Sequence, residues 1–398
     1  QSGEIAPKLL RRFGITDGNR QTLTLGMLMT QLINPYRYGL FTLLYNSESP
    51  PGEMLTEYAE KEWKHEKHTG ETPVEIIKEV KAHGQEAVDA IEKASPLVTK
   101  DKAEFERIKN DMHCYNALAN NYAEKAQAAL YVLRYKYSHD ITDLEKALPY
   151  LEKSLDWYKK LARLTEDTYL YANSMQTKQR KIPVSGEDGK YKTWTEMLPV
   201  YENELIAFKK NIDSLKSPMP STAVKKIELL QNASVTLITK HGGYYSINTG
   251  SELFSDTSTY IKNFAEELKQ LEGLKFSRVK QMEEGTHLEF SNVKPVKVLV
   301  GYFNTKEPAY LQPPTLENDA SANDYGQAET KIANALIISG MPSVNIHTYS
   351  FKAGTNTLDL PKGAVLILGF VDDDKLTHSF DAGLSQSGVK EELDWLFE

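Results

Sequence analysis

The spacing of the apolar residues changes once along this chain of 398 residues, near residue 217. Before that point apolar positions recur every three or four residues, which is typical of amphipathic helices. After it, apolar and polar residues alternate, which is typical of strands that bury one face. Between the helical and the strand-like pattern lies Ser217-Pro218-Met219-Pro220-Ser221, whose prolines and serines predict a linker. A single small domain is therefore excluded.

The pattern predicts a multidomain chain with separate α and β parts. We expect an all-α helical bundle over residues 1–216, a linker over residues 217–222, and a mainly antiparallel β-sandwich domain with one inserted helix over residues 223–398. The inserted helix is expected at about residues 257–271. Strand-like alternation occurs in the runs Ser234–Thr239, Leu274–Val279, Thr286–Phe290, Val296–Phe303, Val344–Phe351 and Ala364–Phe370. Gly242-Gly243, Asn248–Gly250 and Ala353–Asn356 indicate hairpin turns.

The helical part should contain about six helices, and the longest is expected over Asp101–Ser138. Its apolar stripe includes several Ala residues, which let a neighbouring helix approach closely. Three further helices have a capping-box start signal, in which Thr72, Thr142 or Thr193 is followed three residues later by Glu.

A weak internal repeat aligns residues 148–160 with residues 198–210. Both copies begin with Leu-Pro, continue to a Glu four residues after the Leu, and end in a Lys-Lys pair. The likeness is explained if both segments are amphipathic helices that bury a similar apolar face in the core. A tetratricopeptide-like scaffold is the alternative, although such solenoids need three or more copies.

Composition narrows the class of partner. The chain has 47 basic and 55 acidic residues, a net charge of −8, which argues against nucleic acid or an anionic membrane as the main partner. The most apolar window, Leu23–Leu44, is interrupted by Gln31, Asn34, Pro35 and Arg37 and predicts no membrane span. The chain begins with Gln1 and lacks a basic and apolar leader, so we expect a processed protein or a segment of a longer one.

No catalytic or cofactor motif stands out. The chain has no Gly-x-Ser-x-Gly elbow and no phosphate-binding glycine loop, and its single cysteine, Cys114, lies on a helical stripe where an inert thiol is expected. His65 and His68 have a spacing that zinc could use, but lysines surround them. The Asp-rich run at residues 372–374 and the Asn-Asp pairs at 318–319 and 323–324 lack the order of a calcium loop. We expect no metal and no cofactor.

Two polar segments are candidates for a binding site. Within the apolar stretch near residue 30 lie Asn34, Tyr36 and Arg37, which must be hydrogen-bonded if buried and so either fasten a helix corner or line a cleft. The second segment, residues 169–181, combines aromatic rings, amides and a guanidinium, the groups that hold sugars by stacking and by hydrogen bonds. The predicted ligand-binding residues are Tyr169, Tyr171, Asn173, Gln176, Gln179, Arg180, Trp194, Asn34, Tyr36 and Arg37.

These segments also carry a resemblance. Residues 20–27, 34–39, 171–177 and 179–183 resemble the C-terminal region of large secreted gut-bacterial proteins linked to polysaccharide degradation, which are poorly characterised and of glycoside-hydrolase type. In layout, a helical bundle followed by a β-sandwich is similar to the region after the catalytic barrel of bacterial α-glucuronidases. The resemblance implies an exported protein, at the cell surface or in the periplasm, and no catalytic residue can be carried over.

On these grounds the sequence predicts the non-catalytic C-terminal accessory region of a larger exported carbohydrate-active protein, which supports or completes a glycan-binding site. Its partners would be a glycan or a preceding catalytic module of the same polypeptide. We expect no activity from this chain alone, within a parent of glycoside-hydrolase type. Two alternatives stay open: a tetratricopeptide-like interaction scaffold, and a glycoside hydrolase in its own right.

Overall fold

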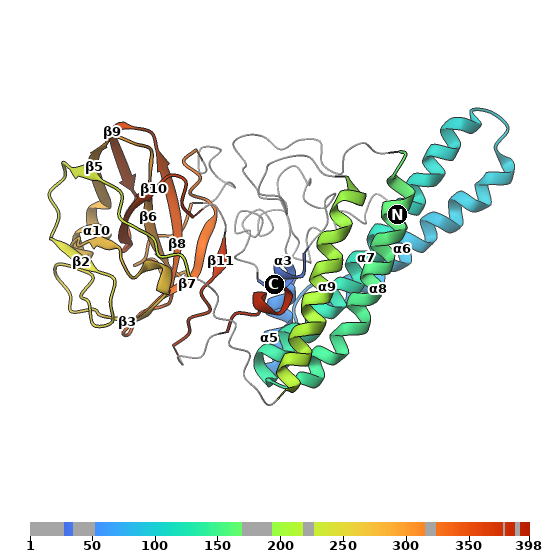
Figure 1. The fold of residues 1–398 in the computed structure, drawn as a ribbon, viewed down its shortest axis with the longest axis horizontal. Coiled ribbons are helices and arrows are strands. Elements are labelled where there is room, and N and C mark those ends of the chain that lie inside the picture. The colour runs from blue at the N-terminus through green and yellow to red at the C-terminus, as the bar shows by residue number, and fades with distance from the viewer. Residues whose placement is uncertain are drawn as a thin grey trace. The chain divides into compact units, whose positions relative to one another are not determined.

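A computed structural model describes residues 28–34, 52–168, 193–217, 227–314, 324–376, 379–386 and 391–398. These residues fall into a helical unit, which includes the C-terminal segment Leu393–Glu398, and a β unit (Figure 1). The predicted fold class, helices followed by a mainly antiparallel β domain, is confirmed. The domain boundaries stay a prediction, and most of the expected linker lies outside the described residues.

The helical unit is built around one long helix. Its described elements are α3 (Met29–Ile33), α5 (Leu55–Lys64), α6 (Pro73–Ala94), η2 (Ser95–Leu97), α7 (Lys102–Ser138), α8 (Ile141–Thr165), α9 (Trp194–Lys216) and η4 (Asp394–Phe397). Helix α7 packs against α3, α5, α6 and α8, and its middle is enclosed on all sides. Small side chains such as Ala119, Ala123 and Ala126 are fully buried there, which lets the neighbouring helices approach closely.

The predicted helix starts are largely confirmed. Thr72 and Thr193 accept hydrogen bonds from the backbone of Glu75 and Glu196, and each Glu side chain bonds back to the cap. Helix α8 begins two residues earlier than expected, because Asp140, and not Thr142, caps it by accepting from the backbone N–H of Thr142.

The two copies of the internal repeat form α8 and α9, which pack directly on each other. Lys159 of α8 pairs with Glu202 of α9 at 3.2 Å, and Lys209 of α9 pairs with Glu152 of α8 at 2.6 Å. Each ion pair therefore joins the Glu of one copy to the first Lys of the other. This reciprocity is the pattern of two antiparallel helices related by a local two-fold axis.

The β unit contains two sheets. The larger has the order β11-β7-β8-β6-β10-β4-β2, with β3 also paired to β7, and the smaller has the order β1-β5-β9 (Figure 1). Their bounds are β1 (Val235–Leu237), β2 (Tyr244–Ser246), β3 (Ile261–Phe264), β4 (Glu272–Leu274), β5 (Thr286–Asn292), β6 (Val296–Phe303), β7 (Thr330–Ile338), β8 (Val344–Phe351), β9 (Gly354–Leu360), β10 (Leu366–Asp372) and β11 (Phe380–Asp381). All pairings are antiparallel except that of β11 with β7.

The central strands of the larger sheet are buried on both faces. Every residue of β6 is buried. On one face, Val298 and Val300 of β6 share a core with Leu288 and Phe290 of β5, so the smaller sheet covers this part of the larger one. On the other face, Leu299 and its neighbours pack in a second core. The arrangement is a sandwich, as predicted.

Three local predictions are wrong. The helix expected at about residues 257–271 is instead the strand β3 followed by the 3-10 helix η3 (Glu266–Leu268), because the backbone of β3 pairs with β7. The inserted helix is α10 (Arg278–Glu284), so the expected strand run Leu274–Val279 spans the end of β4 and the start of α10. The turn predicted at Ala353–Asn356 does not close a hairpin, since β8 and β9 belong to different sheets.

Candidate functional site

Of the residues predicted to contact a glycan, the structure describes Asn34 and Trp194. The others lie outside the described residues, so their role stays a prediction: Tyr36, Arg37, Tyr169, Tyr171, Asn173, Gln176, Gln179 and Arg180.

Trp194 is the first residue of α9 and has the surroundings of a core residue. Its side chain is 8% exposed and lies in a cluster with Tyr158 and Tyr201. The hydroxyl of Tyr158 donates to the carbonyl oxygen of Trp194 at 2.9 Å. A direct contact between this ring and a ligand stays a prediction, and the described contacts make Trp194 an anchor for the start of α9.

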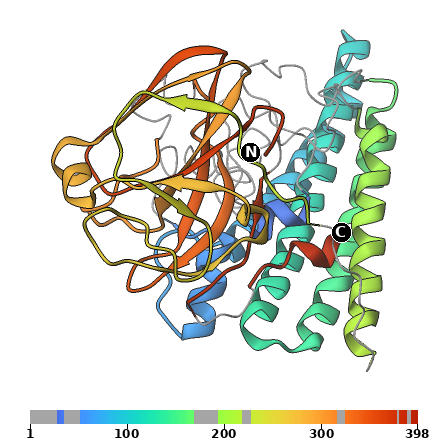
Figure 2. The ribbon, with the colours of Figure 1, turned by 60° about the vertical axis from the view of Figure 1, so that its left-hand side comes forward.

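Asn34 joins the end of α3 to the C-terminal η4. Its Nδ2 donates to Oδ2 of Asp394 at 3.4 Å, and both residues are buried. Helix η4 also lies beside α9 (Figure 2). Nδ2 of Asn211 on α9 donates to the carbonyl oxygens of Trp395 and Leu396, and Phe208 stacks on Phe397. Of the two readings of this polar segment, the described contacts of Asn34 favour the one that fastens a helix corner.

A buried ion pair lies at the centre of the helical unit. Nζ of Lys125 on α7 donates to Oε2 of Glu204 on α9 at 2.9 Å, and the two side chains are 1% and 6% exposed. The same ammonium lies 4.0 Å from the ring centroid of Tyr201. The other oxygen of Glu204 accepts from the backbone N–H of Met29, the first residue of α3. Burial lowers the pKa of Lys125, and Glu204 opposes that change.

Other polar residues of α7 are buried in the same stretch. Nδ2 of Asn121 donates to the carbonyl oxygen and to Oγ of Ser154 on α8, at 2.8 and 2.9 Å. Glu124 pairs with Lys81 of α6 at 2.6 Å. We call Asn116, Asn120, Asn121, Glu124 and Lys125 the polar belt of α7. The sequence analysis missed it, although polar residues interrupting an Ala-rich stripe were a visible signal.

A second charged cluster surrounds His68, after α5. Its Nδ1 lies 2.6 Å from Oε2 of Glu53 and its Nε2 lies 2.7 Å from Oε1 of Glu62. Oε1 of Glu53 also accepts from Nζ of Lys61 and from the backbone N–H of Thr69. Both ring nitrogens face carboxylates, which only accept, so the doubly protonated imidazolium fits this site best.

The electrostatics of this cluster agree with its geometry. The hydrogen bond to Glu62 raises the pKa of His68 most, burial opposes the rise, and the bond to Glu53 adds to it. For Glu53, burial acts to raise the pKa, but the bonds from Lys61, His68 and Thr69 together outweigh it and lower the pKa. His68 is thus a charged clamp between two carboxylates.

A pocket of about 310 Å³ lies beside Glu53. Its lining is polar and charged, and consists of Gly52, Glu53, Glu57, Glu60, Lys61, Lys64, Glu66 and Thr69. No aromatic ring is among these residues, so the pocket lacks the stacking surface typical of a sugar site.

Glycoside hydrolysis usually needs two carboxyl groups on either side of the bond, one of them an acid with a raised pKa. Glu53 and Glu62 do not meet this requirement, because the imidazole of His68 fills the space between them and the pKa of Glu53 is lowered. Burial raises the pKa of the Cys114 thiol to about 12, so this thiol stays protonated at neutral pH and is no nucleophile. The Lys125–Glu204 pair and the His68 cluster therefore serve to hold the helical unit together.

The metal candidates of the sequence are not arranged as metal sites where the structure describes them. His65 caps α5 in the left-handed conformation, at φ 57°, while both ring nitrogens of His68 face carboxylates. In the described ranges, no group of three or more His, Cys, Asp or Glu residues could hold a metal ion. Within the same ranges, no helix has the length and apolar character needed to cross a membrane.

The chain is similar over its whole length to a solved enzyme. That protein is a GH138 enzyme targeting pectin rhamnogalacturonan II; the TM-score is 0.76, the sequence identity is 46%, and the match covers 100% of this chain and 45% of that one. The chain therefore spans less than half the length of that enzyme. No protein-family profile and no curated protein matches the chain. The predicted link to glycoside-hydrolase-type polysaccharide degradation is supported.

The same match corrects two predictions. The expectation of a non-catalytic accessory region is overturned, because the similarity to a glycoside hydrolase extends over the entire chain. The expectation that this chain alone has no activity is overturned by the same similarity. Of the readings left open by the sequence, the match favours the glycoside hydrolase. The sequence analysis reached the wrong conclusion because it treated the lack of a recognisable motif as an absence of catalysis, although a carboxylate pair leaves no motif.

The His68 clamp makes the stability of the helical unit depend on pH. The folded-state pKa of His68 lies above its ordinary value of 6.5, so its stabilisation is complete below about pH 6.5 and is lost as the pH rises through the folded-state pKa. The pKa of Glu53 lies below its ordinary value of 4.5, so its stabilisation is present above about pH 4.5 and is lost as the pH falls through the lowered pKa. Urea unfolding from pH 4 to 9 should show the decline on the alkaline side, and His68→Gln should remove it.

The matched control for this experiment is His287→Gln in the β unit, where the exposed His287 pairs with Asp359. This variant should leave the alkaline decline of the helical unit unchanged. If His68→Gln unfolds with the same pH profile as the wild type, the clamp does not operate.

The ion pair between Lys125 and Glu204 should be needed for folding of the helical unit. Lys125→Met leaves the Glu204 carboxylate buried without its cation, and losing one partner of a buried pair costs about 3–5 kcal/mol. The free energy of unfolding, followed by helical circular dichroism in urea, checks this. Lys64→Met, which breaks the exposed pair with Glu60, should change the free energy of unfolding far less than Lys125→Met does. Equal effects of the two variants would contradict the assignment.

Proposed function

We propose that this protein is a glycoside hydrolase that acts on pectic polysaccharide, with rhamnogalacturonan II as the substrate to test first. The observation that carries the proposal is the 46% identity, over 100% of this chain, to an enzyme targeting that pectin. Sequence identity at this level over an entire chain goes with a shared fold, and a shared substrate class is the simplest explanation of it. Because the chain spans 45% of that enzyme, both activity and substrate remain proposals.

The predicted glycan contacts agree with this substrate class. Pectic polysaccharides carry carboxylate groups, and the guanidinium of Arg180 or Arg37 is suited to bind a carboxylate through two parallel hydrogen bonds. The rings of Tyr169 and Tyr171 offer stacking faces for sugars. We propose that these residues contact the substrate. We assign no catalytic acid or nucleophile.

Incubation of purified protein with rhamnogalacturonan II tests the activity. The full product of the gene that encodes this sequence should release mono- or oligosaccharides, measured by anion-exchange chromatography with amperometric detection. A neutral β-glucan serves as the control and should release nothing. If no pectic fraction, rhamnogalacturonan II included, yields a product, the proposed function is wrong.

We also propose that the protein is exported, because pectic polysaccharides are large, charged polymers that a cell meets outside its cytoplasm. In fractionated cells of the source organism, immunoblotting should find the protein in the periplasm or at the cell surface. A protein confined to the cytoplasmic fraction would contradict export.

A further inference from the structure

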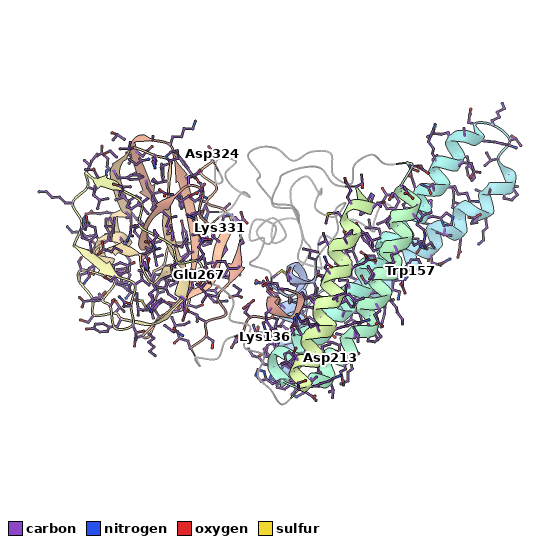
Figure 3. All side chains as sticks on the ribbon, viewed as in Figure 1. Lys136, Trp157, Asp213, Glu267, Asp324 and Lys331 are labelled. Atoms are coloured by element: carbon purple, nitrogen blue, oxygen red, sulfur yellow. The ribbon has the colours of Figure 1, made fainter. Side chains whose placement is uncertain are left out.

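Four residues of α8 form an alternating row of aromatic rings and cations. Tyr150, Lys153, Trp157 and Lys160 follow one another at spacings of three and four, so they lie on one face of the helix. We call them the α8 stripe. Nζ of Lys153 lies 5.7 Å from the ring centroid of Tyr150, and Nζ of Lys160 lies 4.8 Å from that of Trp157. Trp157 is labelled in Figure 3.

The internal repeat shows that its second copy packs without most residues of this stripe. Tyr158 of α8 and its counterpart Phe208 of α9 are both fully buried, so the two copies preserve the large apolar residue at this core position. At the stripe positions the copies differ: α9 has Val200, Asn203 and Ala207 where α8 has Tyr150, Lys153 and Trp157. A helix of the same repeat therefore packs without the two aromatic rings and the first cation. The stripe is a property of α8 alone.

The charges of the stripe are available to a ligand. Two other lysines of α8 are paired, Lys146 with Asp143 and Lys159 with Glu202. Neither Lys153 nor Lys160 forms an ion pair with any residue that the structure describes. The stripe therefore presents two cations that no described carboxylate neutralises, on a chain whose net charge is −8.

The positions of the rings are also restricted. Tyr150 stacks on Tyr131 of α7, with 5.7 Å between the ring centroids and 25° between the planes. Trp157 is half-buried and packs against the core cluster that contains Tyr158. Seven residues separate the two stripe rings, which places them roughly 10 Å apart along the helix axis, about the length of a disaccharide. A platform with fixed rings loses little side-chain entropy when a ligand binds.

We propose that the α8 stripe is a surface binding site for an anionic, uronate-containing polysaccharide. The choice of polysaccharide rests on the proposed function. The C–H faces of the sugars pack on the rings of Tyr150 and Trp157, and the ammonium groups of Lys153 and Lys160 pair with uronate carboxylates. Each exposed contact is weak, so affinity comes from repeated engagement along the polymer and falls as salt increases.

Binding of the full chain to polygalacturonate tests the proposal. In affinity electrophoresis at low salt, the wild type should be retarded by polygalacturonate but not by a neutral galactan. Poly-L-glutamate is the second control, because it carries carboxylates but has no sugar ring to stack on the aromatic side chains. Equal retardation by poly-L-glutamate would overturn the assignment to a sugar polymer.

Matched substitutions locate the site. Lys160→Glu should weaken binding to polygalacturonate several-fold, and Lys153→Glu with Lys160→Glu should weaken it about tenfold. The control is Lys210→Glu, which changes the corresponding exposed Lys of the second repeat copy and should leave binding within twofold of the wild type. Trp157→Leu keeps an apolar side chain against the core but removes the ring, and should weaken binding to the same extent as Lys160→Glu. Asp156→Asn, next to the stripe, should strengthen binding.

Thermal melting monitored by circular dichroism verifies that each variant is folded. If the folded double variant binds polygalacturonate as tightly as the wild type, or if the wild type does not bind it, the proposal is wrong. A protein that hydrolyses pectin with binding unaffected by these substitutions would overturn the stripe and leave the proposed function standing. If binding depends on the stripe but the protein hydrolyses no pectin, the binding site is confirmed and the proposed function is wrong.

Discussion

The enclosure of the middle of α7 is the constraint on which the helical unit depends. Polar groups buried away from water must find partners within the protein. The polar belt of α7 finds them on different neighbours: Lys125 on α9, Asn121 on α8 and Glu124 on α6. Glu204 extends the link to α3 through the backbone N–H of Met29. Lys125, Asn121 and Glu124 thus each bond to a different neighbouring helix, whereas Asn120 of the belt donates to Asn116 within α7 itself.

This constraint also explains why short elements are ordered beside α7. Helix α3 has only five residues, too few to be stable alone. It is held at its first residue by Glu204 and just after its last residue by Asn34, which bonds to η4. The C-terminal segment packs against α9 through Phe397 and Asn211. The ends of the described chain are therefore part of the helical core.

The sequence predicted the parts of the fold in which one periodicity dominates. The strands β6 and β8 begin and end at the expected residues, because β6 is mostly apolar and β8 alternates apolar with polar residues over its length. Strand β7 was missed: its pairing with β8 shifts register twice, and Asn334 within it has φ 46°. The helix expected at about residues 257–271 does not form, because the backbone pairing of β3 with β7 outweighs the local preference of this segment for helix. Such pairings depend on residues far away in the chain.

The site was harder to predict than the fold. Sequence reasoning found Asn34 as a polar residue that needs a partner but could not know that the partner is Asp394. It predicted Trp194 as a ligand contact, which stays a prediction, but it could not predict that this ring packs in a core cluster with Tyr158 and Tyr201. It missed the polar belt and the α8 stripe, because both are visible only when helical faces are assigned to neighbours. Catalytic carboxylates are set by tertiary geometry in the same way.

The central claim, hydrolysis of a pectic polysaccharide, is tested most directly by proton NMR of the anomeric region while the protein acts on rhamnogalacturonan II. Enzymatic glycoside hydrolysis is stereospecific, so one anomer of the new reducing end should appear first and then mutarotate. The account predicts such signals, growing with time. Absence of new reducing-end signals, or vinyl proton signals from an unsaturated uronate formed by elimination, would contradict it.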